Sequence, residues 1–135
     1  MILKSRAATC YTKDMESKKY HVISFKYAFE GIVSALKQEP NLKFHFLAGI
    51  LVLILSFVLK ISKEDWIVII FLIGFVISVE LTNTAIESVV DHFTSQTHPG
   101  AKLAKDISAG AVLIIAVTSA IIGLIIFIPY LFPNG

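Results

Sequence analysis

The sequence predicts an all-α integral membrane protein, built from an N-terminal amphipathic surface helix and three transmembrane helices. Two features of the composition support this fold class: of the 135 residues, 56% are hydrophobic and only 16% are charged, and the mean hydropathy is +0.77. Soluble domains average about 45–50% apolar and about 25% charged residues. The third observation is that the apolar residues gather in three long runs. We therefore expect most of this chain to lie in a bilayer.

The rest of the composition limits the possible function classes. The formal net charge is only +2, so no nucleic acid or other polyanionic partner is expected. Cys10 is the single cysteine, which rules out a disulfide within the chain. The first apolar run comes late and no small-residue cleavage site follows it, so no signal peptide is expected. Residues 1–14 show no periodicity, and residues 1–19 are expected to form a disordered N-terminal extension.

Residues 20–38 have the pattern of an amphipathic helix that lies on the membrane surface. Their apolar side chains recur at helical spacing at the following positions: Val22, Phe25, Phe29, Ile32, Val33 and Leu36. Polar and charged side chains fall on another side of the helix: Lys26, Glu30, Ser34 and Lys37. Such a helix lies in the interface or packs on the rest of the protein, and the two placements are compatible. Pro40 ends it, because the residue before a proline disfavours helix.

A single membrane domain is expected over residues 20–135. It contains three predicted transmembrane helices, at 42–60, 65–90 and 105–132. The first includes Phe44–Leu59, 16 positions without Lys, Arg, Asp or Glu, and the last includes Ile107–Phe132, 26 uncharged positions. A spanning helix needs about 20 apolar residues. The last run qualifies alone, and the other two qualify if their polar ends lie at the interfaces.

The distribution of basic residues predicts the orientation of these helices. Eight Lys or Arg residues precede Phe44, whereas the loop near 60–65 balances two lysines with two acids. Because Lys and Arg favour the cytosolic side, we expect a multi-pass protein of the plasma membrane with a cytosolic N-terminus. The loop near 92–106 is then cytosolic and the C-terminus is outside. Trp66 and Tyr130 would lie at the interfaces, where such aromatics are favoured.

A polar stripe interrupts the second predicted span. Trp66–Val79 covers 14 uncharged residues before Glu80, which is about 21 Å of helix. The hydrocarbon core is about 30 Å thick, so Glu80 is expected inside the membrane, nearer the cytosolic face. A carboxylate there is costly and is functional by default. The stripe continues at helical spacing through Asn83, Thr84, Glu87 and Asp91.

Two carboxylates at two depths suit phosphoryl transfer from ATP to a lipid hydroxyl. Glu80 lies where a lipid hydroxyl reaches and is the predicted general base. Glu87 is expected about 10 Å nearer the cytosol, where one or two carboxylates together with substrate phosphates can hold Mg²⁺. Phosphoryl transfer requires mainly positioning and neutralisation of charge. The predicted function is therefore that of an ATP- and Mg²⁺-dependent lipid kinase.

The loop before the last span adds candidate groups for the phosphates of ATP. A helix that starts near Ala101, after the Pro99–Gly100 turn, would present backbone N–H groups to an anion. Lys105 could neutralise that anion, and Asp106 could hold a water, a ribose or Lys105 itself. The alternative is that Lys102 and Lys105 are ordinary interfacial lysines. The sequence has no Walker A motif and no kinase glycine-rich loop.

Two functions of other classes fit parts of the sequence. In a proton or ion carrier, Glu80 would shuttle protons with His45 as its partner. A path across the membrane would need polar residues through the outer half, but Trp66–Val79 offers only Ser78. A small assembly subunit would pack through the small side chains of Ala109–Ala111. That interpretation leaves the two glutamates unexplained.

The run from Glu80 to Asp91, ELTNTAIESVVD, resembles the signature of the small prokaryotic diacylglycerol kinase family, which includes the undecaprenol kinases of Gram-positive bacteria. The segment Ala104–Val112 resembles the second motif of that family. Phe25–Ile32 and Glu39–His45 resemble its N-terminal part. The likeness covers about residues 20–132, and the length of the first motif makes it specific.

The resemblance implies a homotrimer of three-span subunits, each with a surface helix, and active sites shared between neighbouring subunits. It implies that Glu80 is the general base and that Asn83 lies near the reaction centre. It implies that Glu39 and Glu87 bind the Mg²⁺ ion and, with it, ATP. Further ATP-binding residues are implied at the following positions: Tyr27, His98, Lys105 and Asp106. The lipid alcohol is expected beside Glu80 and Ala109.

Within the family, the sequence favours undecaprenol, whose phosphate is the carrier lipid for cell-wall building. The Asn41–Lys43–His45 pattern and the Phe25–Ala28 run resemble the Gram-positive branch. The predicted reaction therefore converts undecaprenol to undecaprenyl phosphate. A diacylglycerol kinase that makes phosphatidic acid is the alternative.

Overall fold

The computed structural model describes residues 25–93 and 98–133. Within these ranges it is all-helical, with four helices: α2 (Phe25–Gln38), α3 (Pro40–Leu59), α4 (Lys63–Phe93) and α5 (Pro99–Leu131). Three of them, α3, α4 and α5, are long and apolar enough to cross a membrane. The predicted all-α class is therefore confirmed, and the three predicted spans correspond to three candidate membrane helices. The predicted extension 1–19 lies outside the described residues, as does the predicted first turn of the surface helix.

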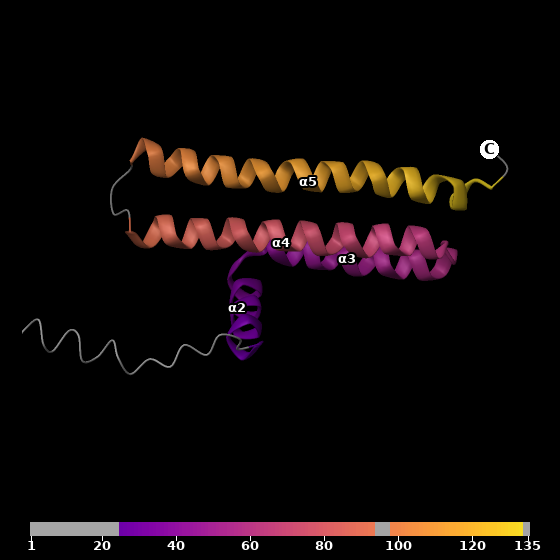
Figure 1. Ribbon diagram of the computed structural model, residues 1–135, viewed down its shortest axis with the longest axis horizontal. Coiled ribbons are helices and arrows are strands. Elements are labelled where there is room, and N and C mark those ends of the chain that lie inside the picture. The colour runs from indigo at the N-terminus through magenta and orange to yellow at the C-terminus, as the bar shows by residue number, and fades with distance from the viewer. Residues whose placement is uncertain (1–24, 94–97, 134–135) are drawn as a thin grey trace, which may run out of the picture. The chain divides into compact units, whose positions relative to one another are not determined.

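The chain divides between Glu30 and Gly31 into two compact units. In the first unit, the beginning of α2 exposes Phe25, Tyr27 and Phe29. Lys26 Nζ lies 3.9 Å from Oε1 of Glu30, one turn later on the helix. In the second unit, α3, α4 and α5 run side by side (Figure 1), and α4 packs against both of the others. The second unit therefore contains all three spans, with α4 at their centre.

Glu39 separates α2 from α3. Its backbone is extended, with φ −97° and ψ 114°, as expected for a residue that precedes a proline. Pro40 then takes the first position of α3, where its missing N–H costs no hydrogen bond. The Lys43 ammonium donates to the Lys37 carbonyl at 2.9 Å, which places a cation at the carboxyl end of α2. The predicted break before Pro40 is confirmed.

A closed network of hydrogen bonds joins the α3–α4 turn to the end of α5. Lys60 adopts the left-handed conformation with φ 52° and ends α3. The Ser62 hydroxyl donates to Asp65 Oδ2 at 2.9 Å and accepts from the Asp65 N–H at 3.1 Å. Tyr130 Oη donates to the same carboxylate oxygen at 2.5 Å and accepts from the Ser62 N–H at 3.0 Å. We call these three residues, Ser62, Asp65 and Tyr130, the Asp65 cluster.

The helix boundaries differ from the predicted ones at a few positions. The α4 helix runs three residues past the predicted end at 90 and begins two residues earlier. The α5 helix begins at Pro99, whereas we predicted a span from 105 and a helix start near Ala101. His98 explains this earlier start, because its ring accepts a hydrogen bond from the Gly100 N–H at 3.1 Å and caps the helix.

Candidate functional site

One face of α4 is buried along the middle of the helix. Its buried residues recur every three or four positions: Ile69, Leu72, Val76, Glu80 and Asn83. Glu80 is 2% exposed and Asn83 is 7% exposed. Among the residues that the structure describes, Glu80 is the one charged side chain that is buried. The face therefore changes from apolar to polar at Glu80, without leaving the packed interior of the unit.

A chain of side-chain hydrogen bonds links α5 to α4 one turn beyond Glu80. The Ser108 hydroxyl lies 2.7 Å from Asn83 Oδ1 and 2.9 Å from the Lys105 carbonyl. On α4, Asn83 Nδ2 donates to Glu87 Oε1 at 3.3 Å. Ser108 is itself only 8% exposed. Three side chains from two helices are thus connected in the order Ser108, Asn83, Glu87.

An ion pair also joins α5 to α4, two helical turns beyond Asn83 on α4. The Lys105 ammonium lies 2.9 Å from Asp91 Oδ1 and 3.0 Å from Oδ2, with both side chains partly exposed to solvent. The sequence offered Asp106 as a partner for Lys105, but the structure pairs Lys105 with Asp91. Asp106 follows Lys105 directly along α5, so the two side chains leave the helix in different directions.

Glu39, at the break before α3, belongs to the same neighbourhood. Glu39, His45 and Glu87 all lie close enough to Glu80 for their charges to act on its carboxylate. Glu39 and Glu87 also act on the Lys105 ammonium. Three helices and one interhelical residue therefore bring together a set of polar side chains that we call the Glu80 cluster: Glu39, His45, Glu80, Asn83, Glu87, Asp91, Lys105 and Ser108.

The carboxylates of this cluster do not form a ready-made metal cage. Over residues 25–93 and 98–133, no three His, Cys, Asp or Glu side chains converge as a metal site would require. Mg²⁺ needs no such cage, since one or two carboxylates and the phosphates of a nucleotide usually complete its coordination. Glu39 and Glu87 supply two carboxylates, which is the donor set that Mg²⁺ usually takes from a protein. Both are electrostatic neighbours of Glu80 and of Lys105.

Other predicted site residues lie outside the hydrogen-bonded chain. His98 is exposed and its ring caps α5. Asp106 and Ala109 are exposed on α5, next to residues of the cluster. Tyr27 lies in the first unit, with a largely exposed side chain. Their predicted contacts to ATP and lipid remain predictions.

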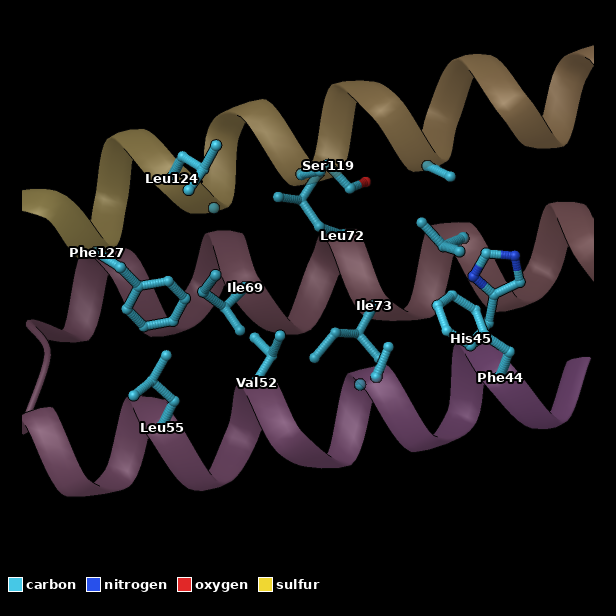
Figure 2. Close-up of a pocket in the computed structure, with 16 residues that line it drawn as sticks. Phe44, His45, Val52, Leu55, Ile69, Leu72, Ile73, Ser119, Leu124 and Phe127 are labelled. Carbon is cyan, nitrogen blue, oxygen red and sulfur yellow. The ribbon is translucent and has the colours of Figure 1, made fainter. Parts of the chain in front are cut away.

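An apolar cavity of about 490 Å³ lies beside the Glu80 cluster, between α3, α4 and α5. Figure 2 shows His45 at one end of it and Phe127 at the other. Leu72 and Val76 line it from the buried face of α4, and Glu80 is the next residue on that face. Of the lining side chains, only those of His45 and Ser119 carry polar atoms. The cavity therefore extends from His45, a member of the polar cluster, along side chains that are almost all apolar.

Sequence reasoning missed two features of this site. It did not single out Ser108, and it did not pair Asp91 with Lys105. A lone serine within a run of small residues gives no periodic signal, and its partner Asn83 is 25 positions away on another helix. Only the packing of α4 against α5 reveals these contacts.

The arrangement can bring an apolar molecule with one polar end to a buried carboxylate. Glu80 would meet that polar end, because it is the next buried residue of α4 after Val76, which lines the cavity. A second, charged reactant can approach from the side of Asp91 and Lys105, whose side chains are partly exposed. Such a site joins a lipid to a water-soluble anion.

Several known proteins are similar in sequence to this chain over most of its length. The family model described as prokaryotic diacylglycerol kinase matches residues 26–127. An undecaprenol kinase from Bacillus subtilis is 49% identical over 108 residues, which are 80% of this chain and 88% of that protein. A diacylglycerol kinase from a Synechocystis species is 36% identical over 109 residues, 80% of this chain and 62% of that protein. A diacylglycerol kinase from Haemophilus influenzae is 33% identical over 95 residues, 70% of this chain and 80% of that protein.

Proposed function

This chain belongs to the prokaryotic diacylglycerol kinase family, and we propose that it phosphorylates undecaprenol to undecaprenyl phosphate with ATP and Mg²⁺. It is a membrane-embedded lipid kinase, and membership of a kinase family implies ATP as the phosphoryl donor. The choice of undecaprenol is supported by the similarity to the undecaprenol kinase of Bacillus subtilis. Diacylglycerol, the substrate in the names of the other two relatives described above, is the competing lipid.

The observation that carries the proposal is that Glu80 is buried one helical turn from Val76, which lines the apolar cavity, and is followed on the same helix by polar residues of the Glu80 cluster. A lipid alcohol has a long apolar chain and one hydroxyl group. The cavity suits the chain because its lining is almost entirely apolar, and the next residue on the same helix face is a buried carboxylate. A carboxylate at this boundary is suited to accept a proton from the hydroxyl group.

The proposed reaction uses Glu80 as the general base. The lipid hydroxyl oxygen forms a bond to the γ-phosphorus of ATP, and the bond from that phosphorus to the β–γ bridging oxygen breaks. ADP leaves, and the hydroxyl proton passes to the Glu80 carboxylate. Asn83, one turn from Glu80, would orient the reacting groups through its amide. The protein contributes mainly by positioning both reactants, as phosphoryl transfer requires.

Glu39 and Glu87 would hold the metal ion, and their carboxylates fit it as described above. Mg²⁺, when bound, would neutralise the negative charge of the nucleotide phosphates. Lys105 would contact the same phosphates, and Tyr27, His98 and Asp106 would contact the rest of ATP. Ala109, next to Ser108 on α5, would leave space for the lipid headgroup because its side chain is small.

The proposal includes the orientation and the assembly of the protein. The basic residues before α3 support a cytosolic N-terminus, and the ATP side would then face the cytosol. Residues 20–135 are proposed to form one kinase domain. Phe57, Ile114 and Ile125 are exposed on the spans, so their surfaces require lipid or another subunit. We expect a homotrimer with shared sites, and chemical cross-linking in native membranes would test it.

A side-by-side assay tests the substrate assignment. Purified protein in mixed micelles is given MgATP and either undecaprenol or a diacylglycerol, and transfer of the γ-phosphoryl group is measured for each lipid. We expect kcat/KM to be at least about tenfold higher for undecaprenol, a difference of about 1.4 kcal/mol in transition-state binding. Equal values, or a preference for diacylglycerol, would overturn the assignment to undecaprenol and leave the lipid-kinase activity intact.

The phosphorylation assay, combined with a measurement of proton flux in liposomes, distinguishes the kinase from an ion carrier. A carrier would move protons across a liposome membrane without ATP, and it would need polar groups along its path. The cavity beside Glu80 offers only His45 and Ser119. Proton flux without ATP, together with no phosphorylation of either lipid, would favour the carrier instead.

A further inference from the structure

The Ser108 hydroxyl has a single proton and two acceptors within reach. One acceptor is Asn83 Oδ1 at 2.7 Å on α4, and the other is the Lys105 carbonyl at 2.9 Å on α5 itself. A hydroxyl donates one hydrogen bond and accepts up to two. If Ser108 donated to the Lys105 carbonyl, its only remaining contact to Asn83 would be as an acceptor from the Asn83 amide NH₂.

Glu87 decides between these two arrangements. The Asn83 amide has its NH₂ group on one side and its oxygen on the other, and the group opposite Ser108 lies against Glu87 Oε1 at 3.3 Å. A carboxylate accepts hydrogen bonds and repels another oxygen. The NH₂ group must therefore face Glu87, and the oxygen must face Ser108. It follows that the hydroxyl proton of Ser108 points at Asn83.

We propose that Ser108 is a positioning residue of the kinase, which fixes the orientation of the Asn83 amide and through it the rotamer of Glu87. The inference rests on the proposed function, in which Glu87 holds the metal ion. Ser108 touches neither reactant in this scheme. Its effect reaches the metal through two hydrogen bonds, in the way that outer partners orient the ligands of a metal.

Burial makes this contact effective. Ser108 and Asn83 are 8% and 7% exposed, so water has little access to replace a lost hydrogen bond. Without the Ser108 hydroxyl, the Asn83 oxygen would be buried without a partner, and the amide could turn over to search for one. A turned amide would present its oxygen to Glu87 and push the carboxylate away from its position.

The test uses metal binding as well as activity. Wild-type protein, Ser108→Ala and Ser108→Cys are purified in micelles and titrated with Mn²⁺ in the presence of a nonhydrolysable ATP analogue, with free Mn²⁺ followed by electron paramagnetic resonance. Mg²⁺ activation of undecaprenol phosphorylation is measured in parallel. We expect Ser108→Ala to weaken Mn²⁺ binding by about tenfold, the lower end of the effect of outer metal partners, with the KM for lipid unchanged.

Ser108→Cys separates hydrogen bonding from packing. A cysteine fills nearly the same space but is a weak donor, so it should behave like alanine if the hydrogen bond matters. Wild-type behaviour of Ser108→Cys would show that packing alone matters and would overturn the proposal. So would unchanged Mn²⁺ binding in Ser108→Ala. The control is Ser78→Ala, which removes an exposed hydroxyl that donates to the Gly74 carbonyl of its own helix, and it should change neither measurement.

Glu87→Gln keeps this inference distinguishable from the proposed function. If Glu87→Gln leaves Mn²⁺ binding unchanged, the metal assignment itself is wrong. If Glu87→Gln weakens binding and Ser108→Ala does not, only the role of Ser108 is wrong. In the double variant, loss of the Ser108 hydroxyl should cause no further weakening, because its effect acts through the Glu87 carboxylate.

Discussion

The two ends of α4 carry polar clusters that differ in how completely their hydrogen bonds are made. In the Asp65 cluster, Tyr130 both donates and accepts, Ser62 does the same, and one carboxylate oxygen receives two hydrogen bonds. In the Glu80 cluster, Asp91 pairs with Lys105 and Glu87 accepts one hydrogen bond from the Asn83 amide. No side-chain hydrogen bond to Glu80 is made among the residues that the structure describes.

This difference separates a structural contact from a reactive site. In the closed network, Ser62, Asp65 and Tyr130 bind one another and hold the helix ends together. An incomplete network of carboxylates is costly in a membrane protein unless protons, a cation or a substrate complete it. The comparison therefore predicts that changes at the Glu80 cluster alter activity, whereas changes at the Asp65 cluster alter stability.

The largest effect is expected for Glu80→Gln. Glutamine keeps the shape of the side chain but cannot accept the hydroxyl proton, so kcat should fall by about 10²- to 10⁴-fold, the usual contribution of a general base. The measurement is phosphoryl transfer from ATP to undecaprenol at saturating MgATP. Binding of Mn²⁺ with the nonhydrolysable ATP analogue should change little, since Glu80 is not one of the proposed metal ligands.

Glu64→Gln is the matched control at the other end of the same helix. Its side chain is exposed beside the Asp65 cluster, and its turnover should equal that of the wild type. Normal turnover in Glu80→Gln would show that Glu80 is not the general base. The functional difference between the Glu80 cluster and the Asp65 cluster would then lose its main support.

Lys105→Met should have the next largest effect, on the KM for ATP. Its ammonium is held by Asp91 at 2.9 Å and partly faces solvent, so it is available to phosphates without unfolding any helix. Loss of one charged contact should raise the KM by about tenfold, which corresponds to about 1.4 kcal/mol of binding. Steady-state kinetics with varied MgATP at saturating lipid measures this change.

Lys102→Met provides the comparison for this change. Lys102 is exposed one turn earlier on α5, and its loss tests whether any interfacial lysine serves equally well. Similar KM values for the two variants would favour the alternative in which both are ordinary interfacial lysines.

The candidate spans and the polar stripe that begins at Glu80 could be predicted from the sequence, because each depends on a local pattern of residues. Uncharged runs define α3 to α5, and Glu80, Asn83 and Glu87 share one helix face by spacing alone. The break before Pro40 follows from a steric rule that involves only neighbouring residues.

Contacts between helices could not be predicted in the same way. Tyr130 was expected only as an interfacial aromatic, yet its hydroxyl bonds to Asp65 at a separation of 65 positions. The pairs formed by Ser108 with Asn83 and by Lys105 with Asp91 depend on the axial alignment of α4 and α5. No single-helix pattern encodes that alignment. Helical spacing only disfavours a pair between the adjacent residues Lys105 and Asp106, and it does not identify Asp91 as the partner of Lys105.

Tyr130→Phe tests the Asp65 cluster, and its effect should be on stability. The variant loses one hydrogen bond to a carboxylate and one from the Ser62 N–H. Because the neighbouring groups are partly exposed and can bind water, the unfolding free energy should fall by only about 1 kcal/mol. Reversible unfolding by a denaturing detergent in mixed micelles measures it, and kcat should stay at the wild-type value. In an Asp65→Ala background the same change should cost less, whereas an equal cost there would show that Tyr130 acts by packing.

The smallest effect is expected where α3 passes α4 between the two clusters. A Cβ atom on Gly49 would lie 3.0 Å from Ile73 Cγ2, so Gly49→Ala must displace that side chain by a few tenths of an ångström. Ile73 lines the cavity and can move into it, which limits the cost. A Cβ atom on Gly74 meets nothing within 4 Å, so Gly74→Ala should gain up to about 1 kcal/mol of helix stability.

The difference between the two glycine variants measures the tightness of the α3–α4 contact. Overpacking typically costs about 1–3 kcal/mol, so Gly49→Ala should lose most or all of the gain that Gly74→Ala shows in the same detergent unfolding assay. Because the displaced Ile73 side chain narrows the cavity, Gly49→Ala should also raise the KM for undecaprenol while leaving the KM for ATP unchanged. Equal stabilisation by the two changes, with no shift in the lipid KM, would show that the helices are not in close contact there and that the cavity does not hold the lipid chain.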